Sequence, residues 1–84
     1  MFDDADLSGV NFSDSKIYKV SFVNANLERS TFSKASEIQQ CNFSGANLTK
    51  VKDIELANFT ECLFDEKTKF PKGFVPSKKG FVKR

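Results

Sequence analysis

The sequence predicts an all-β fold in which short extended segments wind into a square coil, and three observations support this prediction. Large apolar residues recur at steps of five along most of the chain. A small residue lies two positions before nearly every one of them. Residues about 20 positions apart are often alike. A five-residue period suits neither an amphipathic helix nor a strand, but it suits a short extended piece followed by a corner.

The large apolar residues define a register that we call the core ladder. Ten of its twelve steps are five residues long, and two are six, from Phe32 to Ile38 and from Leu48 to Ile54. Seven of the ten phenylalanines lie on this register, so the surplus of Phe is explained as core. The ladder consists of Phe2, Leu7, Phe12, Ile17, Phe22, Leu27, Phe32, Ile38, Phe43, Leu48, Ile54, Phe59 and Phe64.

A second column of small residues accompanies the ladder. Residues two apart in an extended segment point the same way, so the small and the large residue both face inward and the residue between them faces outward. The two residues after each ladder position are mostly polar and form the corner, where Ser, Asn, Asp and Gly are favoured. The small inward column is expected at Ala5, Val10, Ser15, Val20, Ala25, Ser30, Ala35, Cys41, Ala46, Val51, Ala57 and Cys62.

Like residues fall together at a step of one coil, which indicates four sides. The triplet Ala-Asp-Leu at 5–7 is followed by Ala-Asn-Leu at 25–27 and again at 46–48. A simple tandem of pentamers would not sort its members in this way. One side collects four aromatics: Phe2, Phe22, Phe43 and Phe64.

These triplets resemble the loose consensus A-(D/N)-L-x-x of the pentapeptide-repeat proteins, and the resemblance covers roughly residues 2–66. It implies a right-handed quadrilateral parallel β-helix of about three coils. Two departures accompany it. We expect the extra residues of the six-residue steps, near Glu37 and Asp53, to bulge outward, since a charge is not tolerated inside. The chain also begins in mid-side, without the N-terminal cap that repeat stacks need.

The C-terminal segment is predicted to close the coil. The repeat stops after Phe64, and Pro71 and Pro76 prevent the parallel ladder from simply continuing. Phe-Pro-x-Gly-Phe endings like this one close some of the proteins that the chain resembles. We therefore expect two parts, a repeat β-helix at 1–66 and a non-repeat cap and tail at 67–84. The cap should fold over the last coil through Phe70, Phe74 and Val75.

The N-terminal end has no such plug, and its first coil is expected to leave backbone groups and apolar side chains uncovered. We expect this end to be covered by another copy of the chain, by a partner protein or by a preceding part of a longer protein. If another copy covers this end, we expect an end-to-end homo-oligomer.

Formal charge divides along the same boundary. Residues 1–66 hold eleven acidic and six basic residues, a net charge of −5, while residues 67–84 hold seven basic residues and no acidic one. From Ser77 onward the sequence is interpreted as a basic tail. Contacts of this tail with an anionic membrane or nucleic acid are expected at Lys78, Lys79, Lys83 and Arg84.

No catalytic set is visible in the sequence. The chain has no histidine, so no base is present to activate a serine, and no glycine-rich phosphate loop occurs. Cys41 and Cys62 lack CxxC spacing and are expected to be small buried thiols rather than a metal site or a disulfide. The acidic cluster at 3–6 lacks the spacing of a calcium loop. We expect no enzyme activity, no cofactor and no metal.

Three functions remain open from the sequence. The first is a structural or protein-interaction module without catalysis. The second is a DNA mimic that regulates a type II topoisomerase such as gyrase, which some proteins of the resembled family do. The third is binding of an anionic membrane or nucleic acid by the basic tail. No export signal is visible at the N-terminus, so a cytoplasmic location is expected.

Overall fold

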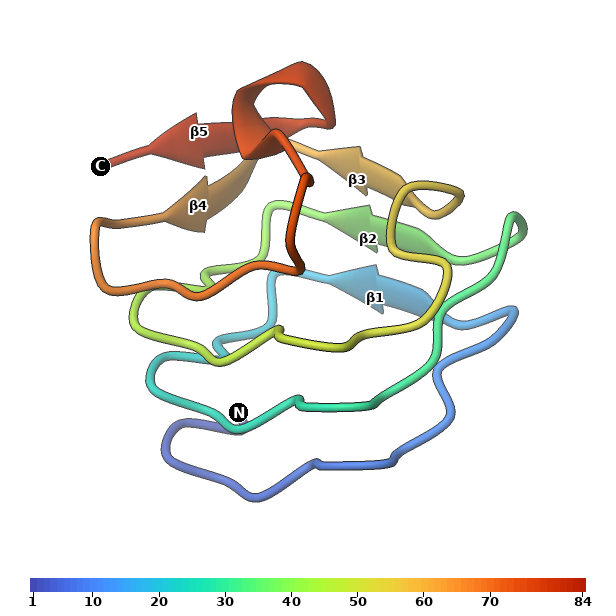
Figure 1. The fold of residues 1–84 in the computed structure, drawn as a ribbon, viewed down its shortest axis with the longest axis horizontal. Helices are drawn as coiled ribbons and strands as arrows, with labels where there is room; N and C mark the ends of the chain where they lie inside the picture. The colour runs from blue at the N-terminus through green and yellow to red at the C-terminus, as the bar shows by residue number, and fades with distance from the viewer.

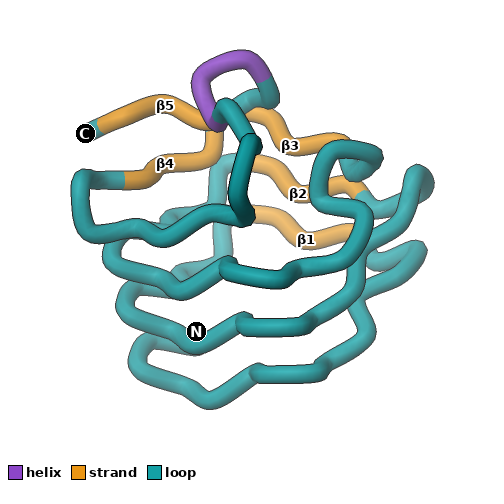
Figure 2. The backbone as a smooth tube through the Cα atoms, in the orientation of Figure 1, coloured by secondary structure: helices purple, strands orange, loops and turns teal.

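A stack of coils runs from the N-terminus to a closing segment at the other end (Figure 1). The computed structural model describes all 84 residues, and its Cα extents are 26 Å along each principal axis, so the molecule is a block and not an elongated rod. Most of the backbone between the strands is loop (Figure 2). The elements are β1 (Lys16–Tyr18), β2 (Glu37–Gln39), β3 (Asn58–Thr60), β4 (Cys62–Phe64), a 3-10 turn η1 (Pro76–Lys78) and β5 (Phe81–Lys83).

The strands pair only in parallel, as a coil requires. One sheet has the order β1-β2-β3, with Ile17 opposite Ile38 and Ile38 opposite Phe59. The second sheet pairs β4 with β5. Isolated parallel bridges form the other sides of the coil and join residues 20 to 22 positions apart. Typical bridges are Asp6 to Asn26, Asn26 to Asn47, Asn11 to Thr31, Thr31 to Lys52, Ser21 to Asn42 and Asn42 to Leu63.

The corners are built by local hydrogen bonds and a left-handed residue. The outward polar residue accepts a hydrogen bond from the amide two positions on: Asn11 Oδ1 from the Ser13 amide at 2.9 Å and Asn42 Oδ1 from the Ser44 amide at 2.9 Å. The second corner residue then takes a positive φ, as in Lys19 at 55°. Asn and Asp suit the first role, which is why they recur between the two inward residues.

The first six-residue step is absorbed in a corner and not at Glu37. Glu37 lies in β2 as a regular outward residue. The extra residue lengthens the corner that precedes it, so Ala35 is exposed and Ser36 takes the inward position expected for Ala35. Ser36 Oγ donates to the Phe12 carbonyl of the previous coil at 2.9 Å and accepts from the Ser33 amide at 3.0 Å. The hydroxyl thus stabilises the longer corner.

The second six-residue step does place its extra residue at Asp53, which is exposed and has a φ of 59°. Ile54 after it is fully buried.

A third six-residue step, which the sequence analysis missed, extends the ladder to Phe70. Lys69 bridges Asn47, so the coil continues past residue 66 by one more side. Thr68 repeats the role of Ser36: its Oγ1 donates to the Phe43 carbonyl at 3.0 Å and accepts from the Asp65 amide at 3.0 Å. The hydroxyl groups of Ser36 and Thr68 therefore make the same two hydrogen bonds at the two three-residue corners.

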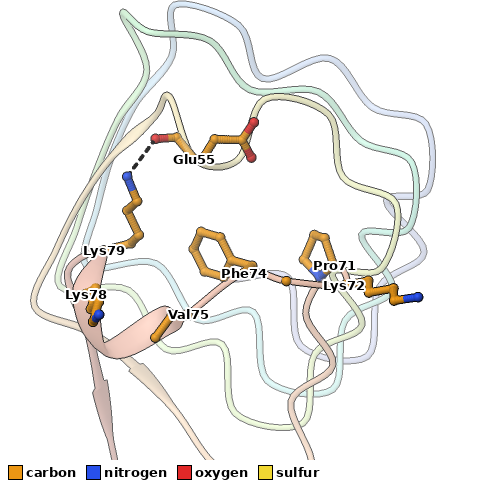
Figure 3. A pocket seen from close by; sticks show the side chains of 8 residues that line it. Glu55, Pro71, Lys72, Phe74, Val75, Lys78 and Lys79 are labelled. Carbon is orange, nitrogen blue, oxygen red and sulfur yellow. Dashed lines mark hydrogen bonds between the residues drawn. The ribbon is translucent and has the colours of Figure 1, made fainter.

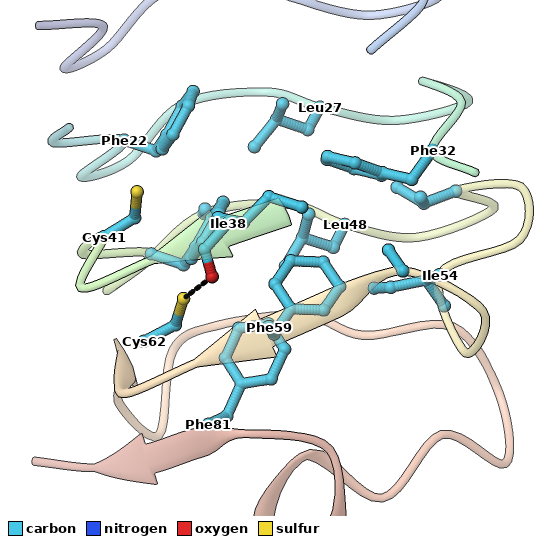
Figure 4. Close-up of a cluster of buried hydrophobic side chains, with 14 of the residues drawn as sticks. Phe22, Leu27, Phe32, Ile38, Cys41, Leu48, Ile54, Phe59, Cys62 and Phe81 are labelled. Carbon is cyan, nitrogen blue, oxygen red and sulfur yellow. Dashed lines mark hydrogen bonds between the residues drawn. The ribbon is translucent and has the colours of Figure 1, made fainter. Parts of the chain in front are cut away.

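The core is a column of stacked side chains between the four sides (Figure 4). The rings of Phe22 and Phe43 lie 4.9 Å apart and nearly parallel, at 2°, which matches the spacing of adjacent strands. Phe2 stacks on Phe22 at 5.5 Å and Phe12 on Phe32 at 5.3 Å. Stacked aromatics add to the stabilisation from burial because offset rings attract each other.

The C-terminal residues form part of the fold, which corrects their interpretation as a tail. β5 pairs with β4, with Phe81 opposite Cys62, and Phe81 is 3% exposed. The large ring of Phe81 thus occupies a position where earlier coils have a small residue. It covers the end of the core and packs on Phe59, with 4.7 Å between the ring centroids. Gly80 makes this possible, since a Cβ there would lie 1.8 Å from the Phe59 carbonyl oxygen.

Candidate functional site

The two cysteines are buried and free. Both side chains are fully buried in the small inward column, on neighbouring coils. Cys62 Sγ lies 3.4 Å from the Ile38 carbonyl, and Cys41 Sγ lies 3.4 Å from the Gln39 carbonyl (Figure 4). The adjacent Cys41 sulfur and burial raise the pKa of the Cys62 thiol above its usual range. A buried, protonated thiol is a poor nucleophile.

The asparagines between the two inward columns serve the corners. Asn26 Oδ1 accepts from the Glu28 amide at 3.0 Å, and Asn47 Oδ1 accepts from the Thr49 amide at 3.0 Å. Asn58 Nδ2 donates to the Lys34 carbonyl at 2.9 Å. These contacts use the side-chain oxygens of Asn26 and Asn47 and the side-chain nitrogen of Asn58 within the corners.

The acidic cluster at 3–6 is also engaged within the chain. Asp3 Oδ1 accepts from the Val23 amide at 3.2 Å and from the Ser21 hydroxyl. Hydrogen bonds from the side chain and backbone of Ser8 lower the pKa of the Asp6 carboxyl. No group of three or more His, Cys, Asp or Glu side chains lies close enough to hold a metal ion.

The open end of the first coil is an apolar hollow of about 640 Å³. Phe2, which begins the aromatic stack, is 41% exposed, whereas Phe22 one coil further in is 1% exposed. β1 is the edge strand of its sheet, so its outer backbone groups have no strand beside them. The hollow is lined by apolar residues whose counterparts in later coils are buried, Phe2, Phe12, Ile17, Val20 and Phe22, together with Ser15, Lys16 and Tyr18.

The opposite end carries a cationic groove of about 350 Å³ in the cap. Three lysines, Lys72, Lys78 and Lys79, and one acidic residue, Glu55, surround a floor made by Phe74 and Pro71 (Figure 3). Lys79 Nζ donates to the Glu55 backbone carbonyl at 3.4 Å, which holds this lysine across the groove. Val75 beside it is 48% exposed, so the groove combines positive charge with apolar surface.

The core ladder is buried in its middle and less buried at its two ends. Phe2 is exposed, and Leu7, Phe12, Ile17 and Phe64 are partly buried against the core. The remaining eight members are buried: Phe22, Leu27, Phe32, Ile38, Phe43, Leu48, Ile54 and Phe59.

Sequence reasoning missed the core residue Phe81 and the place of Phe70 on the ladder. Phe70 was expected only in a non-repeat cap, although Thr68-Lys69-Phe70 has the small-polar-large pattern and a six-residue step leads to it. Phe81 offers no such signal, because a large ring occupies the position of a small residue.

The basic residues 78, 79, 83 and 84 lie on the surface of a folded cap. Lys78 ends η1 and Lys83 ends β5 opposite Phe64. The amide of Arg84 donates to the Phe64 carbonyl at 2.8 Å. All four side chains are exposed, and their backbone belongs to the folded cap.

These features define a class of protein, a repeat protein of parallel coils with a filled core and two unlike ends. The family model for pentapeptide repeats matches residues 2–34 and 34–65, in eight copies. The chain belongs to the pentapeptide repeat family. None of the curated proteins matches it.

One solved structure shares the fold. The chain is similar to the pentapeptide repeat protein alr5209 from Nostoc Pcc 7120, with a TM-score of 0.60 and 20% sequence identity over 96% of this chain and 78% of that one. This likeness implies a right-handed four-sided β-helix. No helix in the structure has the length and apolar character needed to cross a bilayer.

Proposed function

We propose that this protein is a non-enzymatic, cytoplasmic interaction module, a right-handed quadrilateral β-helix whose open N-terminal end binds a protein. The observation that carries the proposal is the hollow of the first coil. It leaves Phe2 exposed and Phe12 and Ile17 only partly buried, in positions that the later coils bury fully. An apolar end with an unpaired strand edge is suited to binding another backbone and its apolar side chains.

The absence of histidine and the local engagement of the carboxylates support the non-enzymatic part of the proposal. The two buried thiols are compatible with a reducing compartment.

The test places a photo-crosslinking phenylalanine analogue at Phe2 in the organism that encodes the chain. We expect a discrete protein adduct from position 2. The matched control places the same analogue at Leu56, which is 51% exposed but does not line the hollow. The adduct should disappear when Ile17→Lys adds a charge to the hollow. Equal adducts from both positions, or none from position 2, would contradict the proposal.

The structure gives less support to a mimic of duplex DNA. A DNA duplex rises about 3.4 Å per base pair, so an extent of 26 Å corresponds to roughly eight pairs. The cap adds positive charge at one end, and a DNA mimic needs an extended negative surface. A gyrase supercoiling assay with excess protein is expected to show no inhibition.

A further inference from the structure

The corners of the coil sort the exposed charges. Corner residues one coil apart lie beside one another along the stack, because each coil bonds to the next in register. At the corner that follows the Ala-Asp-Leu and Ala-Asn-Leu triplets, the Arg29 amide donates to the Thr49 carbonyl at 3.2 Å, which places Arg29 beside Lys50. Both residues have a positive φ, 61° and 59°. Gly9 holds the same place in the first coil, with a φ of 73°.

Three further lysines lie next to this pair. Lys52 is the outward residue of the side after the corner, and Lys69 is the outward residue of the side before it, one coil further on. Lys72 follows Lys69 at the same step by which Lys50 follows Asn47, and it also lines the cap groove. The five cations are all exposed, and we call them the basic ridge: Arg29, Lys50, Lys52, Lys69 and Lys72.

Few carboxylates lie along the basic ridge. Glu28 precedes Arg29 at the corner and is half-buried, and Asp53 follows Lys52. Five cations against these two carboxylates leave a net charge of +3. The corner that precedes the same side of the coil has the opposite character, with four carboxylates and a single lysine: Asp3, Asp4, Asp65, Glu66 and Lys67.

The fold itself gains nothing from the stacked cations. Like charges directly opposite each other on neighbouring strands repel. A positive φ is also taken more easily by glycine or asparagine than by arginine or lysine, and Gly9, Asn24 and Gly45 fill corners of this kind elsewhere in the chain. The pair Arg29 and Lys50 is therefore better explained by contact with an anion outside the fold.

We propose that the basic ridge binds the phosphate backbone of a nucleic acid. The ridge follows one edge of the block over three coils, a length of about 10 Å at the spacing of adjacent strands. This length matches about three successive phosphates of one strand, which rise 3.4 Å each. Contacts to phosphates alone are independent of base sequence. The site is separate from the open N-terminal end.

A nucleic acid suits the ridge better than a membrane surface does. Segments that lie on a membrane combine basic residues with exposed apolar ones. None of the exposed large apolar side chains belongs to the ridge or to the two sides that meet at it. These side chains are Met1, Phe2, Tyr18, Leu56, Val75 and Val82.

The test measures binding of the full chain to a short fluorescent oligo(dT) and to a short DNA duplex by anisotropy, from low salt upward. About three to five phosphate contacts predict a slope of log affinity against log salt of about −2 to −4. The variant Arg29→Gln/Lys50→Gln should bind about tenfold more weakly at low salt. Its slope should be smaller by about 1.4 on the single strand or about 1.8 on the duplex. Urea unfolding should show this variant to be at least as stable as the wild type, because it removes the repulsion between the two cations.

The matched control is Lys16→Gln/Lys19→Gln, which removes the same charge from β1 and the corner after it. Lys19 also has a positive φ, 55°. Binding by this variant should stay within about twofold of the wild type, with an unchanged slope. An equal loss in both variants would show that net charge acts and not the ridge, and would overturn the proposal. So would the absence of binding to either DNA at low salt, or binding to vesicles of anionic phospholipid in place of DNA.

Discussion

At the scale of single residues, two serines show how hydrogen bonding decides whether a buried hydroxyl stabilises or destabilises the fold. Ser30 and Ser36 both face inward and are fully buried. Ser36 bonds to the Phe12 carbonyl, whereas the hydroxyl of Ser30 has no partner. A buried polar group without a partner costs about 1–3 kcal/mol, and a satisfied one contributes about 1 kcal/mol.

We therefore expect Ser30→Ala and Ser36→Ala to change stability in opposite directions. Ser30→Ala should raise the free energy of unfolding by about 1 kcal/mol, because it removes an unpaired hydroxyl. Ser36→Ala should lower it by about 1–2 kcal/mol, because it leaves the Ser33 amide and the Phe12 carbonyl short of a partner. Urea unfolding of the two variants checks this, and equal shifts would contradict it.

Substitutions at Gly80 and Gly73 distinguish the cost of a positive φ from the cost of a steric clash. Both have positive φ, 88° and 85°, but only Gly80 lies against the Phe59 carbonyl. Gly73→Ala should cost about 1 kcal/mol through the backbone alone. Gly80→Ala should cost at least about 3 kcal/mol, because the cap must also move away from the last coil. Thermal unfolding of the two variants is the measurement. Similar melting temperatures would show that the cap moves away from the last coil at little cost.

At the scale of elements, the repeat sides were predictable and the corners and cap were not. The fixed step of five identifies the core ladder, because burial repeats with the coil. The length of a corner leaves no periodic trace, so Ala35 was assigned the position that Ser36 holds. β5 escaped prediction for another reason: its only core residue, Phe81, is large where the pattern calls for small.

Phe81 and Val82 test whether β5 is a structural part of the fold. Phe81→Ala should lower the free energy of unfolding by about 3–5 kcal/mol, since it empties a buried ring site. Val82→Ala, at the next position and 52% exposed, should stay within about 0.5 kcal/mol of the wild type. Chemical denaturation is the measurement. A Phe81→Ala variant as stable as Val82→Ala would restore the interpretation as a tail.

The corner at Asp65 makes stability depend on acid pH. Desolvation opposes the charge of Asp65, but hydrogen bonds from the backbone amides of Gly45, Lys67 and Thr68 outweigh it and lower the pKa of the carboxyl below its ordinary 3.8. Its contribution is therefore complete above that value and is lost as the pH falls through the lowered pKa.

Asp65→Asn should accordingly be less stable than the wild type near neutral pH, and the difference should shrink as the pH falls below 3.8. Glu66→Gln removes the neighbouring exposed carboxylate and serves as the control. Melting temperatures between pH 7 and about pH 2 record the comparison. A difference between wild type and Asp65→Asn that is constant over this range would mean that Asp65 acts through shape and not through charge.

At the scale of the whole molecule, stability should decrease toward the open end. Each coil contacts only its neighbours, so the first coil packs on one side alone. Its amides nonetheless bond to the second coil, as in Leu7 to the Asn26 carbonyl and Phe12 to the Thr31 carbonyl, both at 2.7 Å. The uncovered end was predictable from the sequence, whereas the cationic groove depends on the folded cap and was not.

Hydrogen exchange in dilute solution should follow this order. The amides of Leu7 and Phe12 are expected to exchange faster than those of Leu27 and Phe43, whose bonds lie deeper in the stack. A dilute monomer with a fully protected first coil would argue against the proposed docking end.

The hydroxyl corners at Ser36 and Thr68 have a consequence for how such sequences change in length. In a flat sheet, inserting one residue turns every following side chain to the wrong face. Here Ser36 and Thr68 close a corner with one residue more than usual, and the side chains after it keep their inward or outward orientation. A single-codon insertion is therefore tolerated at a corner that is followed by serine or threonine, and such indels should accumulate there rather than within the sides.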